Sequence, residues 1–280
     1  MAPLPTLPRS IVGLLIIMGL AIPPTEAQEI DERLQELEPD EDEQVPGVPP
    51  PSLQERFDEL EAIRDAGDFQ RIMEELEALL EQYPDNGEVL WRLARTRTDV
   101  AERTTEEEER SRELLFQAHE EAQRAVELLP EHSFAHLTKS VTAGRAALVA
   151  STRQQIELSR TMREYADKAI ELDPENDLAY HLRGRWHYEV AGLGFVSRNV
   201  VRIVYGGLPD ASYRQAEADY RRAIELQERV VHRFELGRTL KEIGNRHGAR
   251  AQFERVLSLP QEDVTDPIYK ERAEELLQRL

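Results

Sequence analysis

Apolar and small residues recur along most of this chain at the three- and four-residue spacing of a helix that buries one face. Ala166 and Ala169 lie near the end of one such helix, Pro174 marks a turn, and Tyr180 and Gly184 lie near the start of the next. Small residues let a neighbouring helix approach closely, and a single helix pair cannot bury its apolar face alone. The pattern therefore predicts an all-α protein built of stacked helix pairs.

Related units recur from Ser52 onward, where Ser52 and Glu55 have the spacing of a capping box that starts a helix. The first unit ends at Pro84 and keeps the 34-residue register of a tetratricopeptide repeat. Pro130 follows Pro84 by 46 residues, and Pro174 follows Pro130 by 44. We therefore expect longer helices in the second and third units.

The fourth unit is interrupted, because the second helix, marked by Ala216 and Tyr220, arrives about 20 residues late for the repeat. An insertion therefore occupies residues 192–210. A fifth unit follows, and a polar-faced helix over residues 268–280 supplies the cap that an open solenoid needs. The sequence predicts a tetratricopeptide-like α-α superhelix of about five helix pairs with a capping helix, over residues 52–280.

The N-terminal pattern is that of a secretory signal. Arg9 precedes the apolar run 11–22, and Ala27 ends a small-residue cleavage site. A run of this length falls short of the roughly 20 residues that span a bilayer, so we favour cleavage over an uncleaved membrane anchor. We interpret residues 1–27 as a signal peptide, and we expect an exported, periplasmic protein that is soluble after cleavage.

Residues 28–51 have the composition of a disordered linker. Nine acids and one arginine lie between Glu29 and Gln44, and a proline-rich stretch follows. Self-repelling charge and consecutive prolines do not form a packed core. A functional acidic tail is the alternative.

The composition narrows the classes of function. The 280 residues include 55 acids and 35 bases, for a formal net charge of −20, and no cysteine. An acidic surface without clustered Lys and Arg disfavours nucleic acid as a partner. The lack of cysteine excludes disulfides, thiolate nucleophiles and zinc ribbons.

Three segments carry a resemblance to a known family: VLWRLAR at 89–95, HLRGRWHYEVA at 181–191 and GGLPDASY at 206–213. Together with the uneven repeat lengths, they resemble the regulator of microtubule dynamics family over residues 53–280. The resemblance implies a helical-repeat interaction domain. Some relatives associate with microtubules, and others tether membranes or carry lipid; this chain differs in having the signal peptide in place of a mitochondrial or membrane-anchoring segment.

No pattern of a common enzyme is found. The chain has no glycine-rich phosphate loop, no G-x-S-x-G and no H-E-x-x-H. His181 and His187 are six residues apart and thus on different helix faces, whereas metal ligands on one helix favour spacings of three or four. We therefore expect packing or surface histidines, no metal, no cofactor and no catalysis.

Positions 2, 5, 9 and 12 of each unit face a concave groove in this repeat type, and they predict an apolar and basic binding surface. The candidate groove residues are Trp91, Arg95, Phe134, Leu137, Val141, His181, Arg185, Tyr188, Phe234, Arg238 and Lys241. Basic residues on one face of an acidic protein suit an anionic guest. The alternative is that the apolar members pack on flanking segments and the arginines pair with nearby acids.

Two functions remain open for this surface. The first is a non-enzymatic scaffold that engages a protein or peptide segment in the groove. The second is a carrier of a lipid or other anionic amphiphile in the same groove.

The insertion carries a second candidate surface. Apolar residues recur there at helical spacing, and Arg198 and Arg202 lie one turn apart on another face. The bland interpretation is an extra helix that fills the end of the superhelix. The functional one is a lid or a membrane contact that uses Phe195, Arg198 and Arg202.

Processing of the signal peptide can be checked directly. Expression with the native leader in a secreting host should give a mature chain that starts at Gln28, because Ala27 ends the cleavage site. Intact-mass measurement reports the new terminus. Recovery of the full-length chain from the membrane would contradict the assignment.

Overall fold

A computed structural model describes residues 51–65, 67–104, 107–193 and 206–280. The predicted signal peptide, and all of the predicted linker but Pro51, lie outside these residues. The helices in the described ranges are α3 (Pro51–Asp65), α4 (Phe69–Gln82), α5 (Gly87–Arg103), α6 (Glu108–Leu128), α7 (Ser133–Leu148), α8 (Thr152–Leu172), α9 (Asp177–Ala191), α11 (Tyr213–Leu226), α12 (Val230–Glu242), α13 (Arg246–Ser258) and α14 (Asp266–Gln278). These ranges hold no strand, and no helix in them is long and apolar enough to cross a bilayer.

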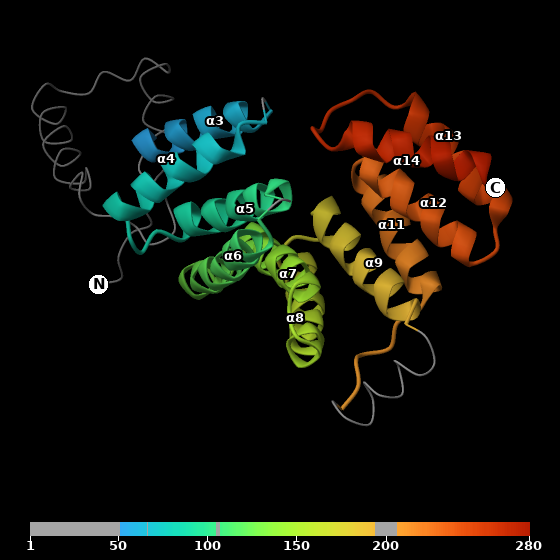
Figure 1. Ribbon diagram of the computed structural model, residues 1–280, viewed down its shortest axis with the longest axis horizontal. Helices are drawn as coiled ribbons and strands as arrows, with labels where there is room; N and C mark the ends of the chain where they lie inside the picture. Colours follow the sequence, from blue (N-terminus) through green and yellow to red (C-terminus); the bar gives the residue numbers. More distant parts are fainter. Residues whose placement is uncertain (1–50, 66, 105–106, 194–205) are drawn as a thin grey trace, which may run out of the picture. The chain divides into compact units, whose positions relative to one another are not determined.

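The helices form antiparallel-type pairs in chain order, which confirms the predicted all-α superhelix (Figure 1). The pairs are α3 with α4, α5 with α6, α7 with α8, α9 with α11 and α12 with α13, and α14 packs on the last pair. We call α5, α7, α9, α12 and α14 the inner row, because each also contacts the next member of the row. The second helices of the described pairs make no such contacts with one another.

Side-chain caps start the helices after each proline turn. Asn86, two residues after Pro84, accepts hydrogen bonds from the backbone N–H groups of Glu88 and Val89, at 2.9 and 3.1 Å. Asn176 occupies the same place after Pro174 and caps α9. An asparagine cap satisfies backbone donors that the helix itself leaves unpaired, and is worth about 1 kcal/mol. The proline turns at Pro84 and Pro174 therefore fix where the second and fourth pairs begin.

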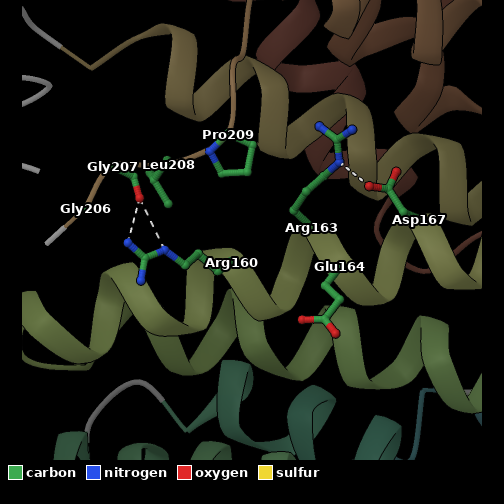
Figure 2. A pocket seen from close by; sticks show the side chains of 8 residues that line it. All are labelled: Arg160, Arg163, Glu164, Asp167, Gly206, Gly207, Leu208 and Pro209. Atoms are coloured by element: carbon green, nitrogen blue, oxygen red, sulfur yellow. Dashed lines mark hydrogen bonds and ion pairs between the residues drawn. The ribbon is translucent and has the colours of Figure 1, made fainter. Parts of the chain in front are cut away.

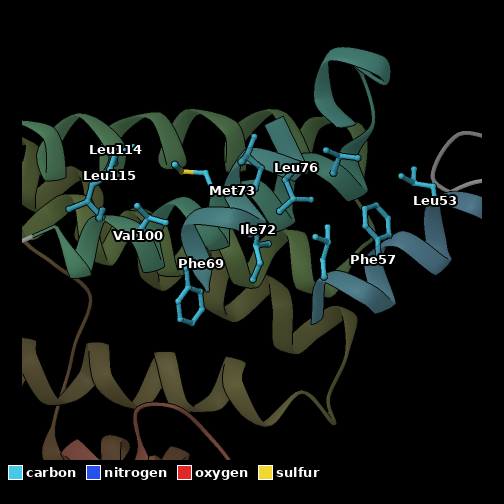
Figure 3. Close-up of a cluster of buried hydrophobic side chains, with 13 residues drawn as sticks. Leu53, Phe57, Phe69, Ile72, Met73, Leu76, Val100, Leu114 and Leu115 are labelled. Carbon is cyan, nitrogen blue, oxygen red and sulfur yellow. The ribbon is translucent and has the colours of Figure 1, made fainter. Parts of the chain in front are cut away.

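The core lies between the helices of each pair and between neighbouring pairs. Figure 3 shows the N-terminal part of this core, where apolar side chains from α3 to α6 meet. The buried members of this cluster are Leu53, Phe57, Leu60, Phe69, Ile72, Met73, Leu76, Val89, Leu93, Val100, Ala101, Leu114 and Leu115. As predicted from the proline spacing, the second and third pairs contain longer helices: α6 and α8 have 21 residues each, against 14 in α4.

Small residues set the helix spacing within the later pairs. A Cβ atom at Gly184 of α9 would lie 3.1 Å from Cε1 of Tyr220 on α11, and one at Gly237 of α12 would lie 2.6 Å from Cε1 of Phe253 on α13. Tyr220 and Phe253 are fully buried. The aromatic ring of one helix therefore occupies the space that a side chain on its partner would need.

Two neutral histidines join neighbouring helices by accepting hydrogen bonds from cations. Nζ of Lys139 on α7 lies 3.0 Å from Nε2 of His119 on α6, and Nη1 of Arg163 on α8 lies 2.9 Å from Nε2 of His187 on α9. An arginine has only protons to donate, and so has a charged lysine, so each Nε2 carries no proton. Burial and the adjacent cation lower the pKa of both imidazoles to about 4.

A third histidine link joins α9 to α12. Nε2 of His232 lies 2.8 Å from a carboxylate oxygen of Asp177, and its Nδ1 lies 3.0 Å from Nδ1 of His181. When Nε2–H donates to the carboxylate, Nδ1 of neutral His232 is free to accept from His181. Burial lowers the pKa of both histidines, and His232 lowers that of His181 further. His181 and His187 thus pack between helices, as their spacing suggested.

Acid should weaken these links. The unfolded histidines titrate near pH 6.5, whereas His119 and His187 stay neutral in the native state down to about pH 4. Between these values the unfolded chain binds more protons, so the free energy of unfolding falls as the pH falls. Each fully shifted histidine contributes at most about 1.4 kcal/mol per pH unit. Urea unfolding at pH 7, 6 and 5 measures the slope.

Two variants separate the contribution of His187 to the pH dependence of the free energy of unfolding from the general effect of net charge. His187→Gln should reduce the slope by one histidine's contribution, because it removes one suppressed titration. His247→Gln, at an exposed position on α13, should leave the slope unchanged. Equal slopes in the wild type and His187→Gln would show that this link does not depend on a neutral imidazole.

The close contact at Gly184 should not tolerate a large side chain. Gly184→Leu forces the α9 backbone away from Tyr220 and should lower the free energy of unfolding by roughly 1 to 3 kcal/mol, although leaving glycine gains helix propensity of up to about 1 kcal/mol. Glu189→Leu, at an exposed position of the same helix, is the control and should cost less. An unchanged denaturation midpoint in Gly184→Leu would mean that α9 and α11 can accommodate a leucine side chain at this contact.

Candidate functional site

Arginines from four helices of the inner row share one surface, which we call the inner face. They are Arg95 on α5, Arg145 on α7, Arg185 on α9 and Arg238 on α12. Burial is the largest influence on the pKa values of Arg95 and Arg145 and lowers both, whereas the charge of Asp99 on α5 raises both. One carboxylate thus acts on arginines of two helices, so the charges of the inner row are close enough to affect one another.

Three of the four arginines have carboxylate partners. Arg95 lies 3.5 Å from a carboxylate oxygen of Glu61, and Arg238 donates to Glu235 at 2.8 Å. Arg145 lies 2.5 Å from an oxygen of Glu102. The alternative that the groove arginines pair with nearby acids therefore holds at Arg95 and Arg238, two of the predicted set.

Arg185 differs from its neighbours. It is half-buried, and within the described part of the chain it makes no hydrogen bond and no ion pair. Its charge nevertheless lowers the pKa values of His181 and Arg145, after burial and other neighbours, and it opposes the burial-driven rise in the pKa of Tyr269. These groups come from α7, α9 and α14, so the charge of Arg185 acts on three members of the inner row.

The arginines are reachable and yet desolvated. Arg95 leaves 44% of its side chain exposed and Arg145 leaves 31%. Burial nevertheless lowers the pKa values of both guanidinium groups, and the nearby carboxylates of Glu61 and Glu102 only partly offset it. A side chain can be partly exposed and still have a pKa lowered by burial when protein surrounds its charged group on several sides and solvent reaches it from one.

Apolar surface lies beside these charges on α7. Phe134 is 43% exposed, and its ring stacks on that of Trp91 with centroids 5.9 Å apart. Leu148, at the end of the same helix, is 69% exposed. Trp91 itself is buried and donates from Nε1 to Glu88 at 2.8 Å, and Leu137 is also buried. The predicted residues of α5 and α7 thus divide into packing positions and accessible ones.

The other predicted groove residues divide in the same way. Tyr188 is half-buried, with the guanidinium of Arg238 4.5 Å from its ring centre. Phe234 is buried against Tyr269, with ring centroids 5.2 Å apart. Val141 is half-buried, Lys241 is exposed, and His181 lies in the histidine link described above.

A small pocket of about 280 Å³ lies between α12 and α14. Its lining residues are Phe234, Arg238, Arg272, Glu275 and Leu276. Two of these belong to the predicted groove set, and three come from the capping helix. The pocket places the capping helix at the inner face.

Sequence reasoning missed Arg145, Tyr269 and Arg272. Arg145 follows Val141 by four residues, so extending the counted positions by one turn would have found it. Tyr269 and Arg272 lie on the capping helix, which the repeat positions do not cover. Their contribution follows from α14 packing on α12.

A larger pocket of about 530 Å³ lies beside the Gly-Gly-Leu-Pro element (Figure 2). It is lined by Arg160, Arg163, Glu164, Asp167, Gly206, Gly207, Leu208 and Pro209. Arg160 donates two hydrogen bonds to the carbonyl oxygen of Gly207, at 2.6 and 3.2 Å, and thereby ties the element to α8. Phe195, Arg198 and Arg202, the predicted lid or membrane contact, lie outside the described residues.

Known proteins resemble this chain in sequence and in fold. It is 28% identical to mouse regulator of microtubule dynamics protein 1 over 208 residues, which cover 73% of this chain and 68% of the relative. It is 31% identical to bovine regulator of microtubule dynamics protein 3 over 189 residues, which cover 67% of this chain and 40% of that relative.

A solved structure supports the repeat architecture. A thermophilic TPR protein from Thermus thermophilus superposes with a TM-score of 0.60 at 17% identity, and the match covers 79% of this chain and 97% of that one. At this identity the likeness concerns the fold alone. The sequence model of regulator of microtubule dynamics protein 1-3 matches residues 55–280, which is nearly all of the helical region. The chain therefore belongs to the regulator of microtubule dynamics family.

Proposed function

We propose that this protein is a non-enzymatic scaffold that holds a segment of a protein partner against the inner face. The observation that carries the proposal is the combination of accessible apolar side chains on α7, Phe134 and Leu148, with the guanidinium group of Arg185 on α9, which forms no hydrogen bond or ion pair with the described residues. Apolar anchors supply binding energy, and a placed charge supplies orientation and specificity. The contacts along the inner row give such a segment several helices to lie across.

The alternative is a carrier of a lipid or another anionic amphiphile on the same face. A carrier needs an apolar cavity that encloses most of its ligand. Two pockets among the described residues are open to solvent and have arginines and acids in their linings. The names of the relatives also refer to microtubules, which are protein assemblies. We therefore favour a protein segment, and we keep the exported location as part of the proposal.

A peptide selection tests the binding face. Peptides selected on the immobilised wild-type protein from a random display library should bind the Phe134→Glu variant at least tenfold more weakly, because the substitution places a charge at the apolar anchor. The control is Leu128→Glu on α6, since Leu128 is 40% exposed, close to the 43% of Phe134. Fluorescence anisotropy with the selected peptides measures both variants. Equal affinity for Phe134→Glu and the wild type would place the binding surface elsewhere.

The same protein preparation separates the two functions. Organic extraction of the purified chain followed by mass spectrometry should yield no lipid in stoichiometric amount. One phospholipid or fatty acid per chain would favour the carrier instead.

A further inference from the structure

We propose that Arg185 is the carboxylate-binding residue of the inner face, and that the bound segment is an acidic peptide. This inference rests on the proposed scaffold function and names the chemistry of its partner. Four steps lead to it: the local supply of acids, the charges that act on Arg185, the acids bonded to the other arginines, and the geometry of the guanidinium group.

Two acids of the inner row are bonded to other arginines. Glu235 acts electrostatically on the same groups as Arg185, but both of its carboxylate oxygens accept from Nη1 of Arg238, at 3.1 and 2.8 Å. Glu102 is paired with Arg145. In a chain with 55 acids and 35 bases, an arginine without a carboxylate partner is not explained by a shortage of acids. Glu102 and Glu235 are thus each bonded to another arginine, and Glu189, one helical turn after Arg185 on α9, forms no ion pair with it.

Arg185 meets both a repulsion and an attraction in the free protein. Beyond the effect of burial, it lowers the pKa of Arg145, because the two cations repel each other, and it opposes the burial-driven rise in the pKa of Glu235, because this carboxylate attracts it. Burial removes part of the water that would otherwise screen this repulsion. A bound carboxylate would offset the repulsion and supply the missing hydrogen-bond acceptor.

The acids bonded to the other arginines disfavour a ligand with many negative charges. Arg95, Arg145 and Arg238 each have a carboxylate partner, and Arg185 is the one of these four arginines that is bonded to no carboxylate of the described residues. The paired acids remain close by and would repel a polyanion such as a nucleic acid. A peptide side chain that brings a single carboxylate would pair with Arg185 alone.

The guanidinium group also selects the form of the ligand. Its planar N–H groups match the two oxygens of a carboxylate and form two parallel hydrogen bonds. The exposed apolar side chains of α7 add a surface for the neighbouring residues of the same segment. An acidic segment with apolar residues beside its carboxylate therefore fits the inner face in both charge and polarity.

The test compares two labelled peptides of 12 residues with blocked ends. One combines Glu and Leu at helical spacing, and the other replaces every Glu by Gln. Fluorescence anisotropy at low salt should show the wild type binding the Glu peptide at least tenfold more tightly, although a protein of charge −20 repels it overall. Arg185→Gln should remove this preference, and Arg185→Lys should keep part of it.

The control variant is Arg153→Gln, which makes the same change of charge at an exposed position of α8 and should keep the full preference. Thermal unfolding of Arg185→Gln should show a midpoint close to that of the wild type, because no hydrogen bond is lost and the removed repulsion from Arg145 opposes the lost attraction to Glu235. A lowered midpoint would assign Arg185 a structural role.

Other outcomes overturn the inference and leave the scaffold function to its own test. One is a wild type that binds the Glu peptide no better than the Gln peptide, or binds neither. Another is a full preference retained in Arg185→Gln. The last measurement compares binding of the protein to vesicles of anionic phosphatidylserine and of neutral phosphatidylcholine. Binding to the anionic vesicles that is lost in Arg185→Gln, without binding to the Glu peptide, would assign the residue to a lipid headgroup instead.

Discussion

The close approach of the two helices in each pair is the constraint on which the rest of the structure depends. At Gly184 and Gly237 the partner helix fills the space that a Cβ atom would enter, with the buried rings of Tyr220 and Phe253. Such contacts fix the spacing of α9 with α11 and of α12 with α13. Since the inner-row helices also touch one another, this spacing decides which side chains share the inner face. The positions of side chains on the inner face therefore depend on how the inner-row helices pack against their partner helices on the other side.

Most polar side chains that lie between helices have a hydrogen-bond partner on the neighbouring helix. Arg97 on α5 makes two hydrogen bonds to Glu121 on α6, at 3.0 and 2.9 Å, and the buried histidines each have a defined donor or acceptor. A buried polar group without a partner costs about 1 to 3 kcal/mol. Among the described residues, the buried side-chain atoms that lack a partner are Nε of Arg92, Nδ1 of His136, Nδ1 of His187 and Oη of Tyr220. Arg185 also has no bonded partner among the described residues, and the acidic segment that we propose would supply one.

Much of the fold was predictable from the sequence, and less of the site was. The proline turns, the small residues and the late second helix of the fourth unit indicated the pairs in their correct order, because local turn chemistry and helix periodicity act over short distances. Burial was harder to predict: Trp91 and Leu137 occupy groove positions of the repeat, yet pack inside. Their burial depends on how far neighbouring pairs rotate, which the uneven repeat lengths change. The pairing of Arg238 with Glu235 could be expected from their spacing, whereas that of Arg145 with Glu102 joins two helices and needed the structure.

Arg183 and Arg185 show how one helix separates folding from binding. An α-helix turns by about 100° per residue, so two positions apart lie on nearly opposite faces. Arg183 faces the neighbouring helices, where it donates to both oxygens of Asp219 at 3.0 and 2.6 Å and to Asp167 at 3.2 Å. Arg185 faces the inner row, where its charge acts on three other helices without a bonded partner. The same type of side chain thus stabilises the stack on one side of α9 and offers unused hydrogen-bond donors on the other. In the proposed scaffold, a change of the segment bound at the inner face would therefore leave the contacts of Arg183 with Asp219 and Asp167 in place.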